Sequence, residues 1–413
     1  MRIVVLCPHF APDVAPTGAV VTRLVDELAA RGHRLDVVTA RPWYRLHAVE
    51  PGWGGRPLRV ETTEWGRIIR IHPFTGTDKR NLVARAWAFA LFTSLATVAA
   101  CLGRRADAVL AMSPPLTLGP AGWITALCRR APLVLNIQDV HPDVAVEVGA
   151  LTDRRVIDVL RALERFSYRR SDAVTVLSED LASNVASKLD TRSRPKVMVI
   201  PNFVDTEMVR PGERGNAYRR QYGIGSETVV MYAGNVGYSQ PLDLMVAAAA
   251  VLADRPDIRF VVNGGGSGLA ELRSRAQGLA NVTFVPLQPA KRLGEVLAAG
   301  DIHVVALRRG VAHSSVPSKA YSILAAGRPV IASVDPGTAI DKLISSAGAG
   351  LSVPPEDAEA FTAAVVALVD DPARRAAMGR AGRRRVEGGM SPTAVAVAYE
   401  RLFTCLQRGG TLG

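Results

Sequence analysis

The chain of 413 residues has little cysteine, and what it has is scattered, with no Cys-x-x-Cys pair and no histidine cluster nearby. The four cysteines are Cys7, Cys101, Cys128 and Cys405. This spacing predicts neither a disulfide framework nor a zinc site, and it favours a reducing compartment. The strand predicted at Ile3–Cys7 begins too early for a signal peptide. We therefore expect a cytoplasmic location.

Long apolar runs are nearly absent as well. Only Leu82–Leu102 has the length of a membrane span; Arg85 interrupts it, and Lys79-Arg80 and Arg104-Arg105 flank it. Because this run contains an arginine and lies within an alternation of strands and helices, a spanning helix is disfavoured. We expect a helix that lies against a sheet and partly in the membrane interface.

Two nucleotide-binding patterns are missing: a Walker-type phosphate loop and an Asp-x-Asp pair at a strand end. A transferase that holds its nucleotide through magnesium is therefore disfavoured, and we expect neither metal nor cofactor. The segment Asn263–Gly268 resembles a dinucleotide fingerprint, but it does not follow the first strand of a domain. The next predicted strand, Val282–Val285, also lacks the acidic residue that would bind a ribose, which argues against a dehydrogenase.

Charge is plentiful but uneven. The chain is 48% apolar and 21% charged, which describes a globular protein, and its net charge is +12. Residues 1–130 hold 17 Lys and Arg against 9 Asp and Glu, and they also hold all five tryptophans: Trp43, Trp53, Trp65, Trp87 and Trp123. This pattern favours an anionic membrane surface or an anionic lipid-linked ligand. We expect no nucleic acid partner, because no basic helix, zinc finger or aromatic-studded recognition strand is present.

Predicted strands alternate with helices in both halves of the chain. In the first half they are expected at 3–7, 34–39, 108–112, 133–137, 173–177 and 197–200, and in the second at 229–233, 259–263, 282–285, 302–306 and 330–333. A polar connector to about Ser226 separates the halves. The alternation predicts an α/β fold of two Rossmann-like, doubly wound domains that face a central cleft.

We place the domains at residues 1–205 and 206–390, with a helix at 393–407 that packs back on the first domain. The segment Arg41–Glu64 has little periodicity. It is predicted to be a long functional loop over the cleft rather than part of the core.

A phosphate site is predicted in Val316–Ile331. There Ser318 and Lys319 open a helix that Gly327 ends, so the free N–H groups of the helix and one ammonium would attract an anion. The segment from Gly234 to Gly237 forms a second strand-to-helix turn, between a strand and a helix expected from about Pro241 to Leu252. Both helices could converge on one diphosphate; the alternative is a pair of ordinary capped turns.

Several short motifs, spread over the whole chain, together resemble the pattern of a known protein family. They are Pro8–Pro12 with Gly18, Arg31–His33, Ser113–Leu116, Gln138–Asp143, Leu177–Asp180, Ile200–Asp205, Gly234–Gly237 with Gln240, Pro317–Lys319 and Gly327–Val330. In this order and spacing they resemble the retaining glycosyltransferases of family 4, which have the GT-B fold. The nearest resemblance is to a bacterial polysaccharide subgroup that includes N-acetyl-L-fucosamine and L-fucose transferases of O-antigen, capsule and colanic acid assembly.

The resemblance implies a nucleotide diphosphate sugar, a UDP-sugar by preference, on the C-terminal domain and a glycan or polyprenyl-diphosphate-linked acceptor on the N-terminal one. Donor-binding residues would be Gly18, Gly234, Asn235, Gly237, Pro286, Leu287, Ser318, Lys319, Tyr321 and Ser322. Acceptor-binding residues would be Trp43, Tyr44 and Trp53. Catalytic roles would go to Lys319 at the leaving diphosphate, Asp139 at the reacting sugar and His141 at the acceptor, although Asp139 and His141 also suit helix caps and turns.

The sequence departs from the family at two positions. Ser314 and Ser322 stand where many members carry two glutamates, the second of which binds the donor ribose. The main hypothesis is a retaining, metal-independent glycosyltransferase of cell-surface polysaccharide assembly, peripheral at the inner face of the cell membrane. The alternatives are a nucleotide-sugar epimerase of the same fold and a non-catalytic nucleotide-sugar-binding subunit.

Overall fold

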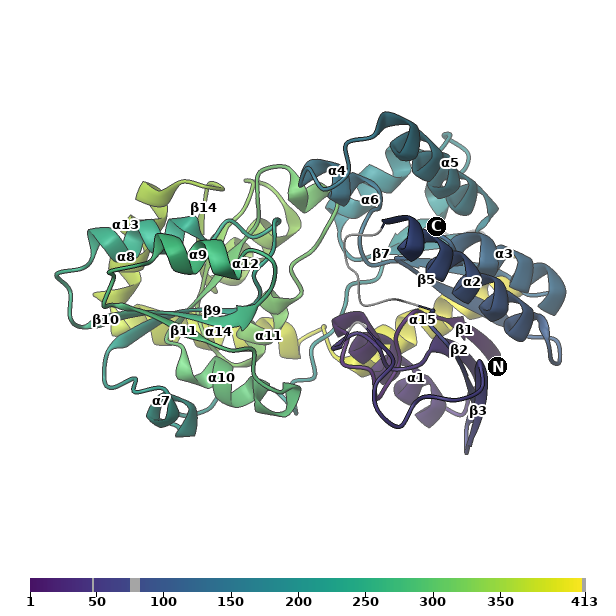
Figure 1. Ribbon diagram of the computed structural model, residues 1–413, viewed down its shortest axis with the longest axis horizontal. Coiled ribbons are helices and arrows are strands. Elements are labelled where there is room, and N and C mark those ends of the chain that lie inside the picture. The colour runs from purple at the N-terminus through teal and green to yellow at the C-terminus, as the bar shows by residue number, and fades with distance from the viewer. Residues whose placement is uncertain (47, 75–81, 411–413) are drawn as a thin grey trace. The chain divides into compact units, whose positions relative to one another are not determined.

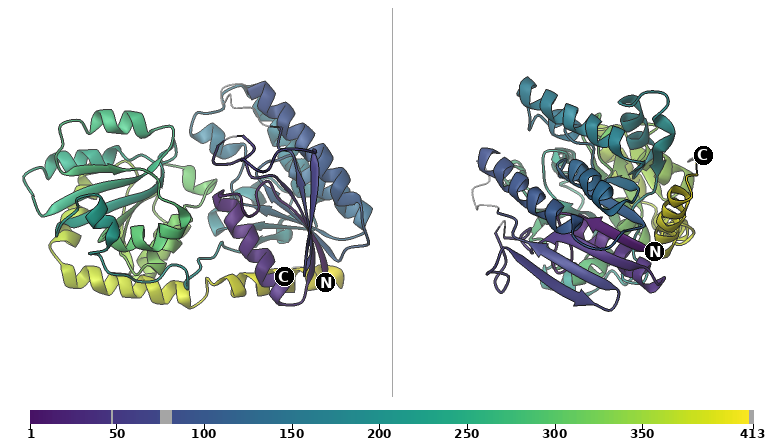
Figure 2. Two further views of the ribbon diagram at one scale, coloured as in Figure 1. Left: turned by 60° about the horizontal axis from the view of Figure 1, so that its bottom comes forward. Right: turned by 90° about the vertical axis from the view of Figure 1, so that its right-hand side faces the viewer.

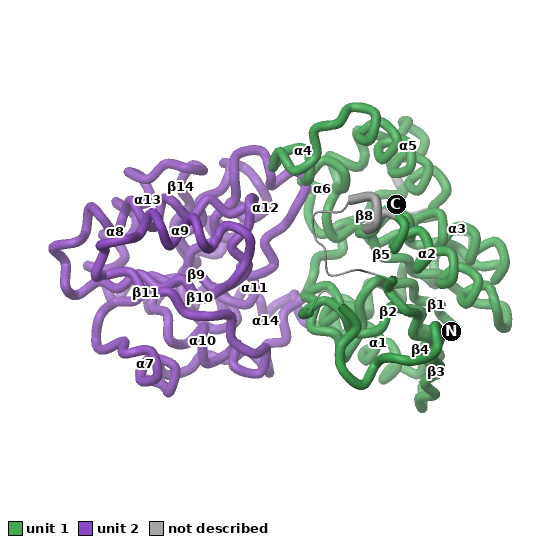
Figure 3. Tube along the Cα trace, viewed as in Figure 1, with its two compact units in different colours: residues 1–202, 392–413 green, residues 203–391 purple. Residues whose placement is uncertain are grey.

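The computed structural model describes residues 1–46, 48–74 and 82–410 (Figure 1). The chain divides into two compact units, which Figure 3 colours separately: unit 1 comprises residues 1–202 and 392–413, and unit 2 comprises residues 203–391. The basic pair Lys79-Arg80, predicted to flank an interfacial helix, lies outside the described residues.

Unit 1 is built on a sheet that, over the described residues, has eight strands in the order β3-β4-β2-β1-β5-β6-β7-β8. All neighbours are parallel except β3 and β4, which pair antiparallel. The strands are β1 Arg2–Leu6, β2 Arg34–Ala40, β3 Leu58–Thr63, β4 Gly66–Ile71, β5 Ala108–Ser113, β6 Leu133–Ile137, β7 Ala173–Val176 and β8 Val197–Val199. Strands β1, β5, β6 and β7 are almost wholly buried, as expected of parallel strands covered by helices on both faces.

Helices cover both faces of this sheet. Helices α2, α3 and α5 lie on one face, while α1 and α15 lie on the other (Figures 1 and 2). The helices of unit 1 are α1 Pro16–Ala30, α2 Leu82–Cys101, α3 Leu118–Arg129, α4 Asp143–Glu147, α5 Arg154–Arg170, α6 Glu179–Ser187 and α15 Pro392–Gln407, with a 3-10 turn at Arg194–Lys196. Among the helices that the structure describes, none has both the length and the apolar character that crossing a bilayer requires.

Helix α15 joins unit 1 through a buried polar network. The Tyr399 hydroxyl accepts a hydrogen bond of 2.8 Å from Asn136 Nδ2 and lies 3.1 Å from Thr175 Oγ1. Gln138 Nε2 donates to Asn136 Oδ1, and Asn202 Nδ2 donates to Gln138 Oε1. Because these buried groups satisfy one another, the network fixes the last helix of the chain on the sheet of unit 1.

Unit 2, all of whose residues are described, holds a six-stranded parallel sheet in the order β11-β10-β9-β12-β13-β14. Its strands are β9 Thr228–Asn235, β10 Ile258–Gly265, β11 Val282–Val285, β12 Ile302–Ala306, β13 Val330–Ser333 and β14 Gly350–Val353. Its helices are α7 Ala217–Gln221, α8 Asp243–Val251, α9 Leu269–Arg275, α10 Leu293–Ala299, α11 Lys319–Ala325, α12 Ala339–Ala347, α13 Ala358–Val369 and α14 Pro372–Glu387, with 3-10 turns at Ala290–Arg292 and Val311–His313.

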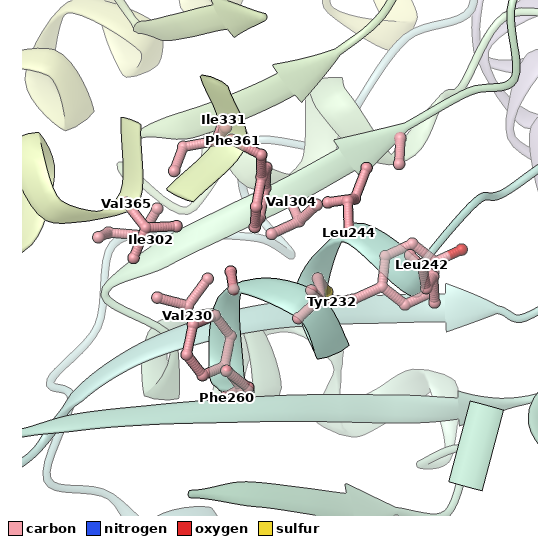
Figure 4. Packing of buried hydrophobic residues seen from close by; sticks show 14 of the residues in the cluster. Val230, Tyr232, Leu242, Leu244, Phe260, Ile302, Val304, Ile331, Phe361 and Val365 are labelled. Carbon is pink, nitrogen blue, oxygen red and sulfur yellow. The ribbon is translucent and has the colours of Figure 1, made fainter. Parts of the chain in front are cut away.

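One hydrophobic cluster of unit 2 lies between its sheet and the helices α8 and α13. Figure 4 shows Phe361 and Val365 of α13 packed with side chains of the central strands, among them Val304 and Tyr232. Both Phe361 and Tyr232 are fully buried. Burial of each such apolar side chain contributes about 1.5–3 kcal/mol. This packing holds the ring of Tyr232 near the carboxyl end of β9, where it contacts Lys319.

The α/β fold with two doubly wound domains is confirmed, and the eleven strands predicted from the sequence are all present. The prediction of a loop over Arg41–Glu64 is wrong in part, because Leu58–Thr63 forms β3. This edge strand pairs only with β4, and Leu58 and Val60 are 45% and 52% exposed, so it lacks the apolar pattern of a buried strand. Strands β4 and β14 also escaped the sequence analysis.

Candidate active site

The sheet of unit 2 reverses its direction of winding between two central strands. From β9 the chain moves outward through β10 to β11, whereas β12, on the other side of β9, leads outward to β13 and β14. In open parallel sheets of this kind, ligands bind beyond the carboxyl ends of the strands at such a reversal. The two phosphate-binding segments predicted from the sequence follow β9 and β12, so the fold brings them to this one point.

Lys319, the first residue of α11, contacts the end of β9 directly. Its ammonium lies 3.9 Å from the centroid of the Tyr232 ring and donates a hydrogen bond to the Tyr232 hydroxyl. That hydroxyl in turn donates to the carbonyl oxygen of Asn235 at 2.5 Å. A Cβ atom built on Gly234 would lie 3.3 Å from Lys319 Nζ. The predicted donor residues Gly234, Asn235 and Lys319 are therefore neighbours in the structure.

Among the residues that the structure describes, no carboxylate is paired with the ammonium of Lys319. Burial lowers the pKa of Lys319 to about 7, and no carboxylate among these residues offsets the shift. A buried cation without a counter-charge is costly to the folded protein. Such a group is the kind that functional sites keep for a ligand that brings the negative charge itself.

Glycines let the backbone close tightly around this point. A Cβ on Gly264 would come within 2.0 Å of the Gly234 carbonyl oxygen, and one on Gly266 would come within 2.4 Å of that of Val236. Val236 N also donates to Gly265 O at 2.7 Å. Gly264 and Gly266 thus have a packing role beside β9.

Arg308 is a further cation at this site that the sequence analysis missed. It follows β12 and is exposed, its Nε donates to the carbonyl of Tyr238, and its backbone N–H donates to Ser239 O at 3.0 Å. It therefore holds the loop that follows Gly237. Its position just after a central strand was the signal that could have identified it.

The remaining donor residues predicted from the sequence lie around these groups at varied depths. Ser318 is exposed before α11, Tyr321 is buried with its pKa raised to about 12 by burial, and Ser322 is half-buried. Ser314 is fully buried, and its hydroxyl donates to Val311 O at 3.1 Å. Pro286 and Leu287 are exposed at the carboxyl end of β11, two strands away from β9.

Unit 1 has a second cluster where its own sheet reverses, beside β1. His9 Nδ1 lies 2.6 Å from Asp13 Oδ2, and the His9 ring stacks on Trp43 with centroids 5.3 Å apart. The backbone N–H of Tyr44 donates to Asp13 Oδ1 at 3.2 Å. Gly18, in the first turn of α1, lies against this cluster, because a Cβ there would come within 3.0 Å of His9 Cβ. Three of the predicted site residues therefore gather around an imidazole–carboxylate pair to which the sequence analysis gave no role.

Trp53 lies in a different environment from Trp43 and Tyr44. The guanidinium groups of Arg59 and Arg70 each lie 4.9 Å from its ring centroid, and its carbonyl oxygen accepts a hydrogen bond of 2.8 Å from Arg41 Nη1. Arg70 is itself buried and bound to Glu61 Oε1 at 3.0 Å. These contacts give Trp53 a packing role, in addition to the acceptor-binding role predicted for it.

Asp139 and His141 follow β6 and are both half-buried. Burial lowers the pKa of His141, while the carboxylates of Asp139 and Asp143 oppose the shift. Asp143 is tied to Lys188 Nζ at 2.6 Å. An imidazole with a carboxylate close by can orient a hydroxyl group or stabilise positive charge. Nowhere in the described ranges do three His, Cys, Asp or Glu side chains gather into a group that could hold a metal ion.

Comparisons with known proteins fit this geometry. Residues 17–202 match the family described as "Glycosyl transferase 4-like domain", and residues 227–371 match "Glycosyl transferases group 1". The chain is a GT-B glycosyltransferase. It is 28% identical over 377 residues to the "Putative colanic acid biosynthesis glycosyl transferase WcaI" of Escherichia coli (strain K12), covering 88% of this chain and 91% of the relative.

Solved structures show the same GT-B fold. Sucrose-phosphate synthase from Thermosynechococcus elongatus matches with a TM-score of 0.74 at 20% identity, over 99% of this chain and 100% of that one. Anabaena HepE in complex with UDP-glucose matches with a TM-score of 0.69 at 13% identity, over 98% of this chain and 99% of HepE. At these identities the likeness establishes the fold of this glycosyltransferase and no further property.

Proposed function

We propose that this GT-B glycosyltransferase transfers a sugar, with retention of anomeric configuration and without a metal, from a nucleotide diphosphate sugar to a glycan or lipid-linked acceptor. The observation that carries the proposal is the unneutralised ammonium of Lys319 beside Gly234, at the point where the sheet of unit 2 reverses. A diphosphate supplies the charge that this site lacks. A UDP-sugar is the preferred donor, and HepE, of the same fold, has been solved with UDP-glucose.

Lys319 and the backbone at Ser318, beside the turn Gly234–Gly237, would stabilise the charge that develops on the departing diphosphate. Tyr232 holds the ammonium in place before the reaction begins, and such preorganised donors are the main source of catalysis in many enzymes. Arg308 would add a second cation from the loop after β12. Tyr321 and Ser322 would contact the ribose, where Ser322 takes the place of a carboxylate in other members.

We assign residues of unit 1 to two tasks, which are stabilising the reacting sugar and binding the acceptor. Asp139 would stabilise the oxocarbenium-like sugar, His141 would orient the acceptor hydroxyl, and Trp43 and Tyr44 would contact the acceptor. The hydroxyl attacks on the face from which the diphosphate leaves, and the departing phosphate accepts its proton. The bond from the anomeric carbon to the diphosphate breaks as the new glycosidic bond forms, so atoms and charge balance.

We further propose that the acceptor belongs to a cell-surface polysaccharide under assembly, built on a polyprenyl diphosphate at the inner face of the membrane. The similarity to a relative named for colanic acid biosynthesis supports this assignment. The surplus of positive charge and the tryptophans of residues 1–130 favour an anionic membrane surface as partner. Fucose or N-acetylfucosamine is the sugar that the resemblance to the polysaccharide subgroup favours.

Calorimetric titration with a panel of UDP- and GDP-sugars tests the donor. We expect one UDP-sugar to bind, and binding of none would contradict the proposal. Mass spectrometry of products formed by membranes supplied with that donor then identifies the acceptor. Conversion of the donor without any acceptor would instead indicate an epimerase, and binding without turnover would indicate a non-catalytic subunit.

A further inference from the structure

Helices α2, α3 and α5 form one continuous layer over a face of the sheet of unit 1 (Figures 1 and 2). Thr93 Oγ1 on α2 lies 2.8 Å from Thr117 Oγ1 at the start of α3. The rings of Trp123 on α3 and Phe166 on α5 meet edge to face, with centroids 5.3 Å apart. The outer side of this layer, which we call the α2–α3–α5 surface, belongs to unit 1 alone.

Apolar side chains line this surface where it crosses α2. Four of them are well exposed, on and just after the helix: Trp87 (72%), Leu91 (46%), Val98 (60%) and Leu102 (65%). At about 100° per residue, these positions fall within an arc of about 60° on the helix. The opposite side of α2, with Ala88, Phe92 and Ala96, is buried against the unit. Helix α2 is therefore apolar on both sides, but only the side with Ala88, Phe92 and Ala96 is packed against the rest of unit 1.

The apolar surface continues onto the next two helices. Ile124 and Leu127 of α3 are 41% and 61% exposed, and Val159 of α5 is 67% exposed. Neither α2 nor α3 contains an aspartate or a glutamate. Exposed apolar side chains on three helices of one layer favour an interaction site over the isolated apolar residues of an ordinary surface.

Arginines border the apolar side chains. Arg104 and Arg105 follow α2, Arg130 follows α3, and all three are exposed. On α5, a shallow hollow of about 490 Å³ is lined by Ala162, Arg165, Phe166, Arg169 and Arg170, with no carboxylate among them. The Arg170 guanidinium lies 5.0 Å from the centroid of the Trp123 ring, which brings this cationic border up to α3.

We propose that the α2–α3–α5 surface docks on an anionic phospholipid bilayer. Apolar side chains would enter the boundary between headgroups and acyl chains, while the arginines would bind lipid phosphates. The inference rests on the membrane partner proposed above and assigns its surface. A second copy of the chain is a poorer occupant, because two such surfaces would oppose arginine to arginine. The one exposed carboxylate within α5, Asp158, is outnumbered by the exposed arginines of that helix, and α2 and α3 contain none.

Sedimentation of the full chain with vesicles tests this surface. We expect binding to vesicles of phosphatidylglycerol and phosphatidylcholine, at least tenfold weaker binding to pure phosphatidylcholine, and a further loss at high salt. Equal binding to both vesicle types, or no binding to either, would overturn the proposal. The assay contains no donor, so its failure would leave the proposed sugar transfer to be judged by donor titration.

Variants locate the contact. The triple change Trp87→Ser, Leu91→Ser, Val98→Ser and the double change Arg165→Gln, Arg169→Gln should each weaken binding to anionic vesicles about tenfold or more. Val251→Ser, at a 72% exposed valine on α8 of unit 2, is the matched control and should bind as the natural chain does. Unchanged vesicle binding of the triple variant would overturn the assignment. It would also be overturned if the natural chain self-associated without lipid and the triple variant did not.

A second measurement does not depend on how well the multiple variants fold. Brominated lipids quench only tryptophans that enter the bilayer, so the fluorescence of the bound chain should fall. Trp87→Phe should remove most of that quenching while binding persists. Quenching that is the same with and without Trp87 would contradict the proposed orientation.

Discussion

The ammonium of Lys319 lies over the Tyr232 ring, 3.9 Å from its centroid, and donates a hydrogen bond to the hydroxyl of the same residue. One side chain of β9 thus positions the first residue of α11 in two ways. Because a tyrosine ring and a neutral hydroxyl orient an ammonium without cancelling its charge, the site remains electropositive.

Replacing Lys319 should impair catalysis more than it impairs the fold. Lys319→Ala is expected to lower kcat at least about a hundredfold, because it removes a charge that stabilises the leaving diphosphate. Lys342→Ala, at an exposed lysine of α12, is the control and should leave kcat unchanged. Steady-state rates with saturating donor measure the effect, and a kcat equal to that of the control would remove Lys319 from the mechanism.

Donor binding should take up a proton above neutral pH. Since the pKa of Lys319 without ligand is about 7, most molecules carry a neutral amine at pH 8, whereas a bound diphosphate favours the ammonium. We expect uptake of about one proton per UDP-sugar bound at pH 8 and close to none at pH 6. Titration calorimetry in buffers of different ionisation enthalpy measures this number. The same uptake in Lys319→Met would assign the proton to another group.

Without ligand, Lys319 should destabilise the folded chain. Its pKa is about 7 in the folded state and about 10.5 when unfolded, so the unfolded state binds more protons between these values and stability rises with pH across them. Lys319→Met should therefore raise the melting temperature by a few degrees at pH 6, and the gain should shrink toward pH 10. Thermal melts of the natural chain and of Lys319→Met across this pH range test the prediction. A gain in melting temperature that grows with pH would contradict it.

The two tryptophans assigned to the acceptor should behave differently. Trp43→Ala is expected to raise the KM for the acceptor about tenfold while leaving donor affinity unchanged, because Trp43 stacks on His9 near the predicted acceptor groups. Trp53→Ala should lower the melting temperature, since Arg59 and Arg70 would lose the ring that both guanidinium groups contact. Acceptor kinetics and thermal melts of both variants separate the roles. If both variants changed the acceptor KM and the melting temperature alike, the separate roles assigned to Trp43 and Trp53 would be wrong.

The polar network on α15 should contribute measurably to the stability of unit 1. Tyr399→Phe leaves the buried groups of Asn136 and Thr175 without their shared partner and is expected to cost about 1–3 kcal/mol. Denaturant unfolding measures the loss, and donor affinity, which we assign to unit 2, should not change. Full stability of Tyr399→Phe would mean that the network closes without the hydroxyl.

The elements that determine the fold were predictable because their patterns are local. Buried parallel strands such as Leu133–Ile137 are short apolar runs, and Gly327 does end α11. Strand β3 was not predictable in this way, since an exposed edge strand is set by its neighbour β4 rather than by its own apolar content. The contacts His9–Asp13 and Tyr232–Lys319 were also not predicted from the sequence. The members of the second pair are 87 positions apart in the chain, so no local pattern relates them.

Helix α15 has a consequence for how the protein is made. Unit 2 is one uninterrupted stretch of chain, whereas unit 1 is completed only by the last 22 residues. A ribosome releases Tyr399 after the whole of unit 2, so the polar network of unit 1 cannot close until unit 2 has been made. Unit 2 can thus finish folding first, and a chain that stops before α15 leaves residues 1–202 without the helix that completes their unit.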